Sequence, residues 1–243
     1  MPVYRDVGVV LRTHKLGESD RIVTLITQDS GRVRAVAKGV RKTHSRFGSR
    51  LEPMSHVQVQ LYRGRELDIV NQVELIEIVT STRAHLEATT DGLAMCEVVE
   101  QLAHDRSPSP HLYRMLVGAL RQLNVSYSPL LLPALQLRLL AEEGVGLCVD
   151  RCVSCGSVDD LDVIDIVAGG TQCGTHRRGM SVSKSALAVL RSIDAGRITS
   201  VLSQAEHTDV VVREVTTIGR SAMEHHLERR IRSSSLFEAP RVG

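Results

Sequence analysis

The chain changes its hydrophobic pattern near residue 80, and this change constrains its fold more than any other feature. The first part contains five segments rich in Val and Ile whose polar and apolar residues nearly alternate, which is typical of β-strands with one buried face. Farther on, apolar residues recur at helical spacing, as in RAHLEATTDGLAMCEVVEQLAHD, which predicts amphipathic helices. We therefore predict a multidomain chain of the α+β class.

The five predicted strands indicate a small closed barrel. They are YRDVGVVLRTH, DRIVTLITQ, GRVRAVAKG, HVQVQLYRG and ELDIVNQVELIEIV. LGESD, QDSG and RGRE lie between strands and supply the residue types that turns need, and QDSGR reads as a short hairpin connection. Five short strands in so few residues match a barrel of the OB type better than an open sheet. We assign residues 1–80 to this barrel and residues 81–243 to a helical domain.

Two short motifs of metal-ligand type interrupt the helical part. Cys152 and Cys155 form the first, and Cys173 and His176 follow after a gap of seventeen residues. Cys and His at such spacing are the ligands of tetrahedral structural zinc sites, and Gly156 can supply the tight turn after the first pair. We predict one structural Zn²⁺ ion bound by Cys152, Cys155, Cys173 and His176, in an inserted module at about residues 147–180.

Other interpretations of these cysteines differ in strength. Cys148 could replace His176 and give a site with four thiolates. A redox pair is not favoured, because such pairs begin a helix in a βαβ unit, whereas a short strand is predicted here. A catalytic zinc ion needs an open coordination position and a general base, and the two motifs contain no Glu. Cys96, among apolar neighbours in a predicted helix, is expected to be a buried structural thiol.

Charge is distributed unevenly along the chain. Residues 31–50 hold seven Lys or Arg and no acidic residue. Because the whole chain has 30 basic and 28 acidic residues, the remainder holds 23 and 28, a net charge of −5. A basic segment on an acidic body is typical of a polyanion-binding face. The alternative is a loop whose charges are simply solvated.

The sequence does not indicate a membrane or secreted protein. The opening MPVYRDVGVVLRTHK has no apolar run of the length found in signal peptides. No uncharged apolar stretch approaches the roughly twenty residues that cross a bilayer. We therefore expect a cytoplasmic protein whose thiols stay reduced, and the odd number of cysteines, five, also fits poorly with a disulfide framework.

Four stretches of the chain carry a family resemblance. They are GVVLRTHKLGESDRIVTLITQDSGRVRAVAKGVRK, SRFGSRLEP, GVGLCVDRCVSCG and GGTQCGTH. In this order they resemble the RecO family of bacterial recombination mediators: the first its opening strands and Lys-Gly-x-Arg segment, and the last two its zinc-binding insertion. The resemblance covers almost the whole chain. One departure is His176, which ends the second motif where many relatives have cysteine.

The resemblance implies an N-terminal OB fold followed by an all-α domain with an inserted zinc module. It implies a mediator of DNA repair and homologous recombination that binds single- and double-stranded DNA and anneals complementary strands. Such a protein helps to load RecA onto strands coated by single-strand-binding protein. Its partners would be RecR and the C-terminal tail of single-strand-binding protein, and it would associate with the nucleoid during repair. Carried over by position, the DNA contacts would be Arg34, Lys38, Arg41, Lys42 and Arg46.

The residues themselves add three expectations about mechanism. The chain has no Trp, two Phe and four Tyr, and only Phe47 lies in the basic segment, so phosphate contacts should outweigh base stacking. No nucleophile–base pair or phosphate-binding loop is apparent, so we predict no enzyme. Together with the resemblance, dense apolar helices such as LLLPALQLRLL suggest that the helical domain presents a groove to a partner peptide, although such a stripe is more often core. The competing hypothesis is a zinc-containing regulator that binds RNA or DNA through the same barrel.

Overall fold

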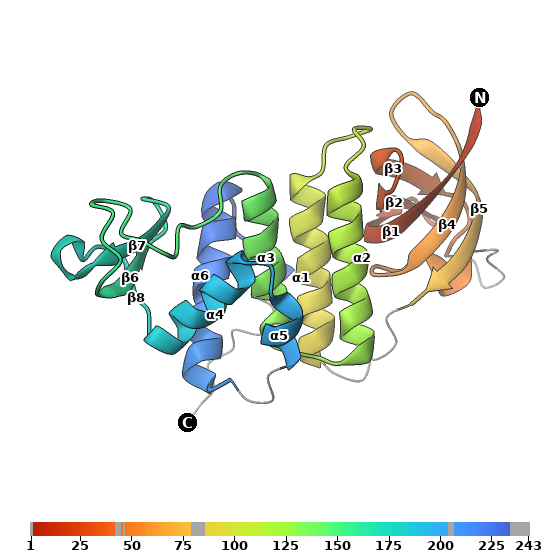
Figure 1. Ribbon diagram of the computed structural model, residues 1–243. Helices are drawn as coiled ribbons and strands as arrows, with labels where there is room; N and C mark the ends of the chain where they lie inside the picture. The colour runs from red at the N-terminus through yellow and green to blue at the C-terminus, as the bar shows by residue number, and fades with distance from the viewer. Residues whose placement is uncertain (1, 42–44, 46, 79–85, 204–206, 234–243) are drawn as a thin grey trace. The chain divides into compact units, whose positions relative to one another are not determined.

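The computed structural model describes residues 2–41, 45, 47–78, 86–203 and 207–233. Strands come first along the chain and helices follow, with a small second sheet inserted among the helices (Figure 1). The fold class predicted from the sequence is confirmed, since a closed barrel precedes a helical region that contains the cysteine motifs.

Residue contacts divide the chain into two compact units. The first unit comprises the residues up to Tyr127 together with Arg232 and Ser233, and the second comprises Ser128–Ile231. The barrel and the first two helices thus belong to one unit, and the cysteine motifs to the other. The domain boundary predicted near residue 80 follows the change from strands to helices, whereas the two units are defined by contacts between residues. The two divisions use different criteria, so the predicted boundary stays a prediction.

Five strands form the closed barrel of the first unit, in the order β1-β2-β3-β5-β4. They are β1 (Val3–Leu16), β2 (Asp20–Thr27), β3 (Gly31–Ala37), β4 (His56–Tyr62) and β5 (Asp68–Glu77). All pairings are antiparallel except the one between β3 and β5, which is parallel and places Ala35 opposite Asp68. This parallel pairing brings the start of β5 beside the C-terminal end of β3.

The barrel interior is filled by branched apolar side chains from alternate strand positions, such as Val23 and Leu25 of β2 and Val33 of β3. A short 3₁₀ helix, Gly48–Leu51, follows the basic segment. It contributes Leu51 to the interior, and the preceding Phe47 also packs there. Fully burying such side chains contributes roughly 1.5–3 kcal/mol each.

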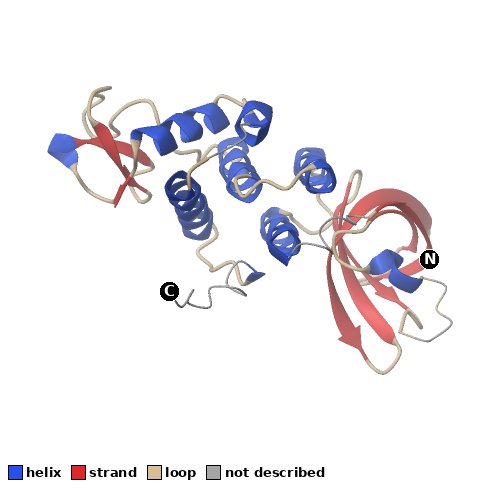
Figure 2. Ribbon diagram, turned by 90° about the horizontal axis from the view of Figure 1, so that it is seen from below, coloured by secondary structure: helices blue, strands red, loops and turns tan. Residues whose placement is uncertain are grey.

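Two helices cover part of the outside of the barrel. Helices α1 (Leu86–Leu102) and α2 (Pro110–Val125) pack against β1 and β2 (Figure 2). Outward-facing Val9, Leu11 and Ile26 are therefore at most 4% exposed. Because both faces of β1 and β2 are buried in this region, the solvent-facing surface of the barrel is left mainly to the other strands and to the loops.

The connection between α1 and α2 is joined to the start of β3. The backbone N–H of Arg32 donates to the carbonyl of His104, and the N–H of Arg106 donates to the carbonyl of Arg32. Gly31 has a φ of +70°, and a Cβ there would lie 1.9 Å from the carbonyl oxygen of Ser107. Only glycine fits this position, because any side chain would collide with backbone.

Among its described residues, the second unit contains the helices α3 (Leu131–Glu142), α4 (Lys184–Asp194), α5 (Ile198–Ser203) and α6 (Asp209–His226). Helix α3 packs against α4 and α6, and a Cβ on Gly219 of α6 would approach Pro133 of α3 to 3.0 Å. Six of the seven leucines of LLLPALQLRLL are at most 6% exposed, and Leu137 is half-buried. The stripe is therefore mostly core, which does not support the hypothesised groove.

A small sheet is inserted between α3 and α4, in the order β7-β6-β8. Its strands are β6 (Leu161–Asp165), β7 (Gly170–Cys173) and β8 (Met180–Ser181). A 3₁₀ turn, Gly174–His176, follows β7 directly. The sheet thereby carries the second ligand motif at the end of one strand and on the turn beside it.

Candidate metal centre and nucleic-acid interface

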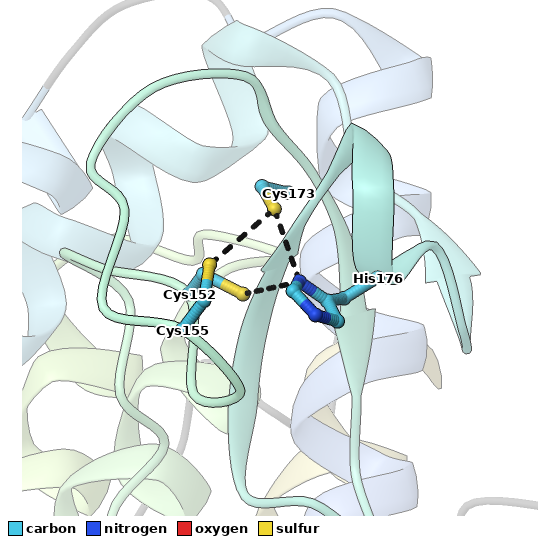
Figure 3. Close-up of side chains that lie close together, drawn as sticks. All are labelled: Cys152, Cys155, Cys173 and His176. Atoms are coloured by element: carbon cyan, nitrogen blue, oxygen red, sulfur yellow. Dashed lines mark hydrogen bonds between the residues drawn. The ribbon is translucent and has the colours of Figure 1, made fainter.

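Three thiols and one imidazole meet at the end of the small sheet (Figure 3). The Sγ atoms of Cys155 and Cys173 are 3.8 Å apart. Nδ1 of His176 lies 3.4 Å from Sγ of Cys173 and 3.9 Å from Sγ of Cys152. All four candidate ligand atoms lie within 4.8 Å of one another, although Cys152 and Cys173 are separated by twenty-one positions in the sequence.

These separations fit one tetrahedrally coordinated ion. Two sulfur atoms bound at about 2.3 Å in a tetrahedron lie about 3.8 Å apart, and a bound sulfur and imidazole nitrogen lie slightly closer. The observed distances of 3.8 Å and 3.4–3.9 Å match these edges. The cluster could therefore hold one metal ion, with Nδ1 as the histidine ligand atom.

Backbone hydrogen bonds fix the loop that carries the first motif. The N–H of Cys152 donates to the carbonyl of Ser157 at 2.7 Å, and the N–H of Gly156 donates back to the carbonyl of Cys152 at 2.8 Å. Gly156 adopts a φ of +78°, which glycine reaches without steric cost. The N–H of Val153 donates to the carbonyl of Thr171 on β7, which ties this loop to the sheet that carries the second motif.

Backbone groups around the cluster also shift the pKa values of its thiols. Contact with the Thr175 backbone lowers the pKa of Cys173. Burial raises the pKa of Cys152, but backbone donors including that of Cys173 outweigh it, and its net pKa is also lowered. The pKa of Cys155 is raised, because its neighbouring thiols outweigh the Ser157 backbone donor that lowers it. Thiolates are the metal-binding form, so the backbone favours the ligand state at two of the three cysteines.

Cys148 has a different role in the structure. Among the described residues it is not a member of the cluster, and its thiol points to the carbonyl of Arg151 at 3.7 Å. Its backbone N–H donates to the carbonyl of Gly169, and its carbonyl accepts from the N–H of Thr171. Cys148 thus joins its loop to β7 through backbone hydrogen bonds, whereas its side chain takes no part in the cluster of four predicted ligands.

Cys96 is fully buried in α1. Burial raises the pKa of its thiol to about 12. A thiol held protonated in this way is unreactive, in agreement with the structural role expected from the sequence.

The basic residues predicted to contact DNA are only partly within the described chain. Arg34, Lys38 and Arg41 are described and exposed, whereas Lys42 and Arg46 lie outside the described residues. Arg34 points outward because its neighbours along β3, Val33 and Ala35, point into the barrel. Among the described residues, no carboxylate pairs with Arg34 or Lys38.

Arg41 is partly engaged within the protein. Its Nη1 donates to the carbonyl of Glu18 at 2.9 Å and more weakly to that of Gly17, and its backbone N–H donates to the carbonyl of Ser19. These residues connect β1 to β2. Arg41 therefore fixes this connection, and only part of its guanidinium remains free to bind an anion.

The aromatic residue of the basic segment is not available to a ligand. Phe47 is 3% exposed and lies in the barrel core. Phe47 is the one aromatic residue of the basic segment, and in the structure it does not lie at the surface. Stacking on this segment would need another planar group.

The β4–β5 connection holds two exposed arginines that the sequence analysis treated only as part of a turn. Arg63 and Arg65 belong to the motif RGRE. In OB folds, the loop between the fourth and fifth strands borders the oligonucleotide-binding face. That rule and the strand assignment together would have identified these residues as candidates.

Within the described chain, no helix is long and apolar enough to cross a membrane.

Comparisons with known proteins extend over both units. A family model described as "Recombination protein O N terminal" matches residues 1–79, and one described as "Recombination protein O C terminal" matches residues 83–235. A protein named "DNA repair protein RecO" from Frankia casuarinae is 41% identical over 245 residues, which cover 98% of this chain and 99% of that protein. The barrel, the helices and the cysteine motifs are therefore all included in the similarity.

Proposed function

Since the chain belongs to the RecO family of DNA repair proteins, we propose that it acts as a mediator of homologous recombination. In this role it binds single- and double-stranded DNA, anneals complementary strands and helps to load RecA onto strands coated by single-strand-binding protein. The work is done by binding rather than by an enzymatic reaction, in the cytoplasm and at the nucleoid during repair.

The observation that carries this proposal is the exposed basic strand of the barrel, defined as β3 (Gly31–Ala37) with Lys38 directly after it. Arg34 and Lys38 face solvent without a carboxylate partner among the described residues, and Phe47, the aromatic of this segment, is buried. A surface of this kind binds phosphates, which carry no sequence information. A protein that holds two backbones and leaves the base edges free allows complementary strands to pair. We assign the phosphate contacts to Arg34, Lys38, Arg41, Lys42 and Arg46.

We also propose that the four-residue cluster binds one structural Zn²⁺ ion. Three sulfur ligands and one imidazole in a tetrahedral arrangement suit zinc better than harder cations. The four ligands Cys152, Cys155, Cys173 and His176 fill the coordination sphere. Bound there, the ion cross-links the loop before β6 to the end of β7 and contributes to the folding free energy of the module.

The partners that we propose are RecR and the C-terminal tail of single-strand-binding protein. The tail is acidic, so it would need a basic or neutral apolar surface. The leucine stripe of α3 is core and is not assigned to this role.

Annealing of labelled complementary oligonucleotides tests the proposal. The protein should accelerate annealing of unrelated sequence pairs to a similar extent, and should still do so when the strands carry single-strand-binding protein. A competition between DNA and RNA of one sequence belongs to the same experiment. No acceleration, together with preferred binding of RNA, would favour a zinc-containing regulator instead.

A further inference from the structure

The guanidinium group of Arg63 lies over an aromatic ring at the edge of the barrel. Its guanidinium carbon is 4.9 Å from the ring centroid of Tyr4, within the roughly 6 Å over which a cation is attracted to a ring face. Arg63 is exposed, and its backbone N–H donates to the carbonyl of Pro2. The described residues give its side chain no carboxylate partner.

The Tyr4 ring, over which Arg63 lies, is fixed by a hydrogen bond from its hydroxyl group. Its hydroxyl donates to the carboxylate of Asp68, which is 1% exposed. Asp68 also accepts from the backbone N–H of Gly64 at 2.8 Å and from Arg106 at 3.0 Å. A buried carboxylate with three donors is a rigid anchor. The ring and the loop that carries Arg63 are thereby fixed relative to each other.

This pair is linked to the basic strand through Asp68. Asp68 and Ile69 of β5 pair with Ala35 and Val36 of β3. The residues before Asp68 therefore approach β3 next to Arg34. Helices cover the outer face of β1 and β2, so the surface available to a nucleic acid leads from the β4–β5 connection along β3.

We propose that the guanidinium plane of Arg63, backed by the Tyr4 ring, stacks on an unpaired base of single-stranded nucleic acid whose phosphates lie on the basic strand. Guanidinium planes stack on unpaired bases, as aromatic rings do. The pair supplies a ring-backed stacking surface beside a basic segment whose one aromatic residue, Phe47, is buried. This inference rests on the proposed nucleic-acid binding and adds to it a contact that double-stranded DNA cannot make, because its bases are already stacked.

Arg63→Lys separates stacking from charge, because lysine keeps the charge but has no plane. The measurement compares the affinity of the full-length protein for an oligothymidine and for a fully abasic strand of equal length. Using homopolymers removes any dependence on the register in which the strand binds. Arg114→Lys, at an exposed arginine of α2, is the matched control.

The wild-type protein and Arg114→Lys should prefer the strand with bases by about five-fold or more, the lower end of the effect of losing one stacked base. Arg63→Lys should lose most of this preference and keep the wild-type salt dependence and melting temperature. If Arg63→Lys keeps the full preference, or if the wild-type protein has none while binding both strands, Arg63 only covers the tyrosine ring and the inference is wrong. If the wild-type protein binds neither strand at low salt, the proposed function itself fails.

Discussion

The cysteine–histidine cluster and the basic strand differ in how firmly the surrounding structure holds their side chains. At the cluster, Cys152 and Cys173 are 1% and 6% exposed, and backbone hydrogen bonds fix the loop beside them. On the strand, Arg34 and Lys38 reach into solvent without a partner among the described residues. Ligands that share one ion contribute to folding when it binds, whereas exposed charges contribute to affinity and are screened by salt. One site should govern stability and the other binding.

The largest effect should follow from Cys173→Ala. This change removes a ligand that contacts both Cys155 and His176, so the protein should lose its metal and the inserted module should unfold. Structural zinc contributes about 10–16 kcal/mol to folding in isolated zinc fingers, so the loss of even part of this free energy should unfold the module. Elemental analysis should give about one zinc per chain for the wild-type protein and little for the variant. A variant that keeps stoichiometric metal would show that Cys173 is not a ligand.

Asp68→Ala should destabilise the barrel without removing the metal. It deprives Tyr4, Gly64 and Arg106 of their common acceptor, and removing a buried hydrogen-bond partner costs about 1–3 kcal/mol. Chemical unfolding should show this loss while the metal content stays at the wild-type value. Asp68→Asn, which retains an acceptor oxygen, is the milder companion. Equal stability of Asp68→Ala and the wild-type protein would mean that this anchor does not support the barrel.

Replacing Arg34 and Lys38 together by Ala should weaken binding and leave folding unchanged. Each phosphate contact contributes roughly 0.7 to the log–log salt slope, so losing two should cost about ten-fold in affinity near 0.15 M salt. The loss should be similar for unrelated sequences, since phosphates are alike. Melting temperature and zinc content serve as controls. A drop in either would show that the basic strand also contributes to folding, which contradicts the division of roles between the two sites.

Cys148→Ala should have the smallest effect. Its structural contribution is made by its backbone, and its thiol lies outside the cluster. Zinc content should stay at one per chain and stability should change by less than about 1 kcal/mol. If Cys148→Ala loses zinc while His176→Ala keeps it, the ligands are four thiolates, with Cys148 in place of His176.

The metal cluster could be predicted from the sequence because its geometry is mostly local. Each motif is a short turn that brings two ligands together, so only the meeting of two turns depends on tertiary structure. The barrel could be predicted for a similar reason, since alternation along each strand separates Val33 and Ala35 from Arg34 before any pairing is known.

The nucleic-acid face was less predictable, because burial depends on residues far away in the chain. Phe47 is a candidate for stacking by sequence, but the closing barrel encloses it. Arg41 is a free cation by sequence, but the β1–β2 connection takes two of its hydrogen bonds. Arg63 gains its position from Tyr4, fifty-nine residues earlier. No local pattern carries such information.

The salt dependence of single-strand binding tests the central claim most directly. Affinity of the wild-type protein and of the Arg34→Ala/Lys38→Ala variant for one oligonucleotide is measured over a series of salt concentrations. Binding through phosphates on the basic strand predicts a steep negative log–log slope for the wild-type protein and a slope flatter by about 1.4 for the variant. Equal slopes for the two proteins would contradict the account and place the binding surface elsewhere on the chain.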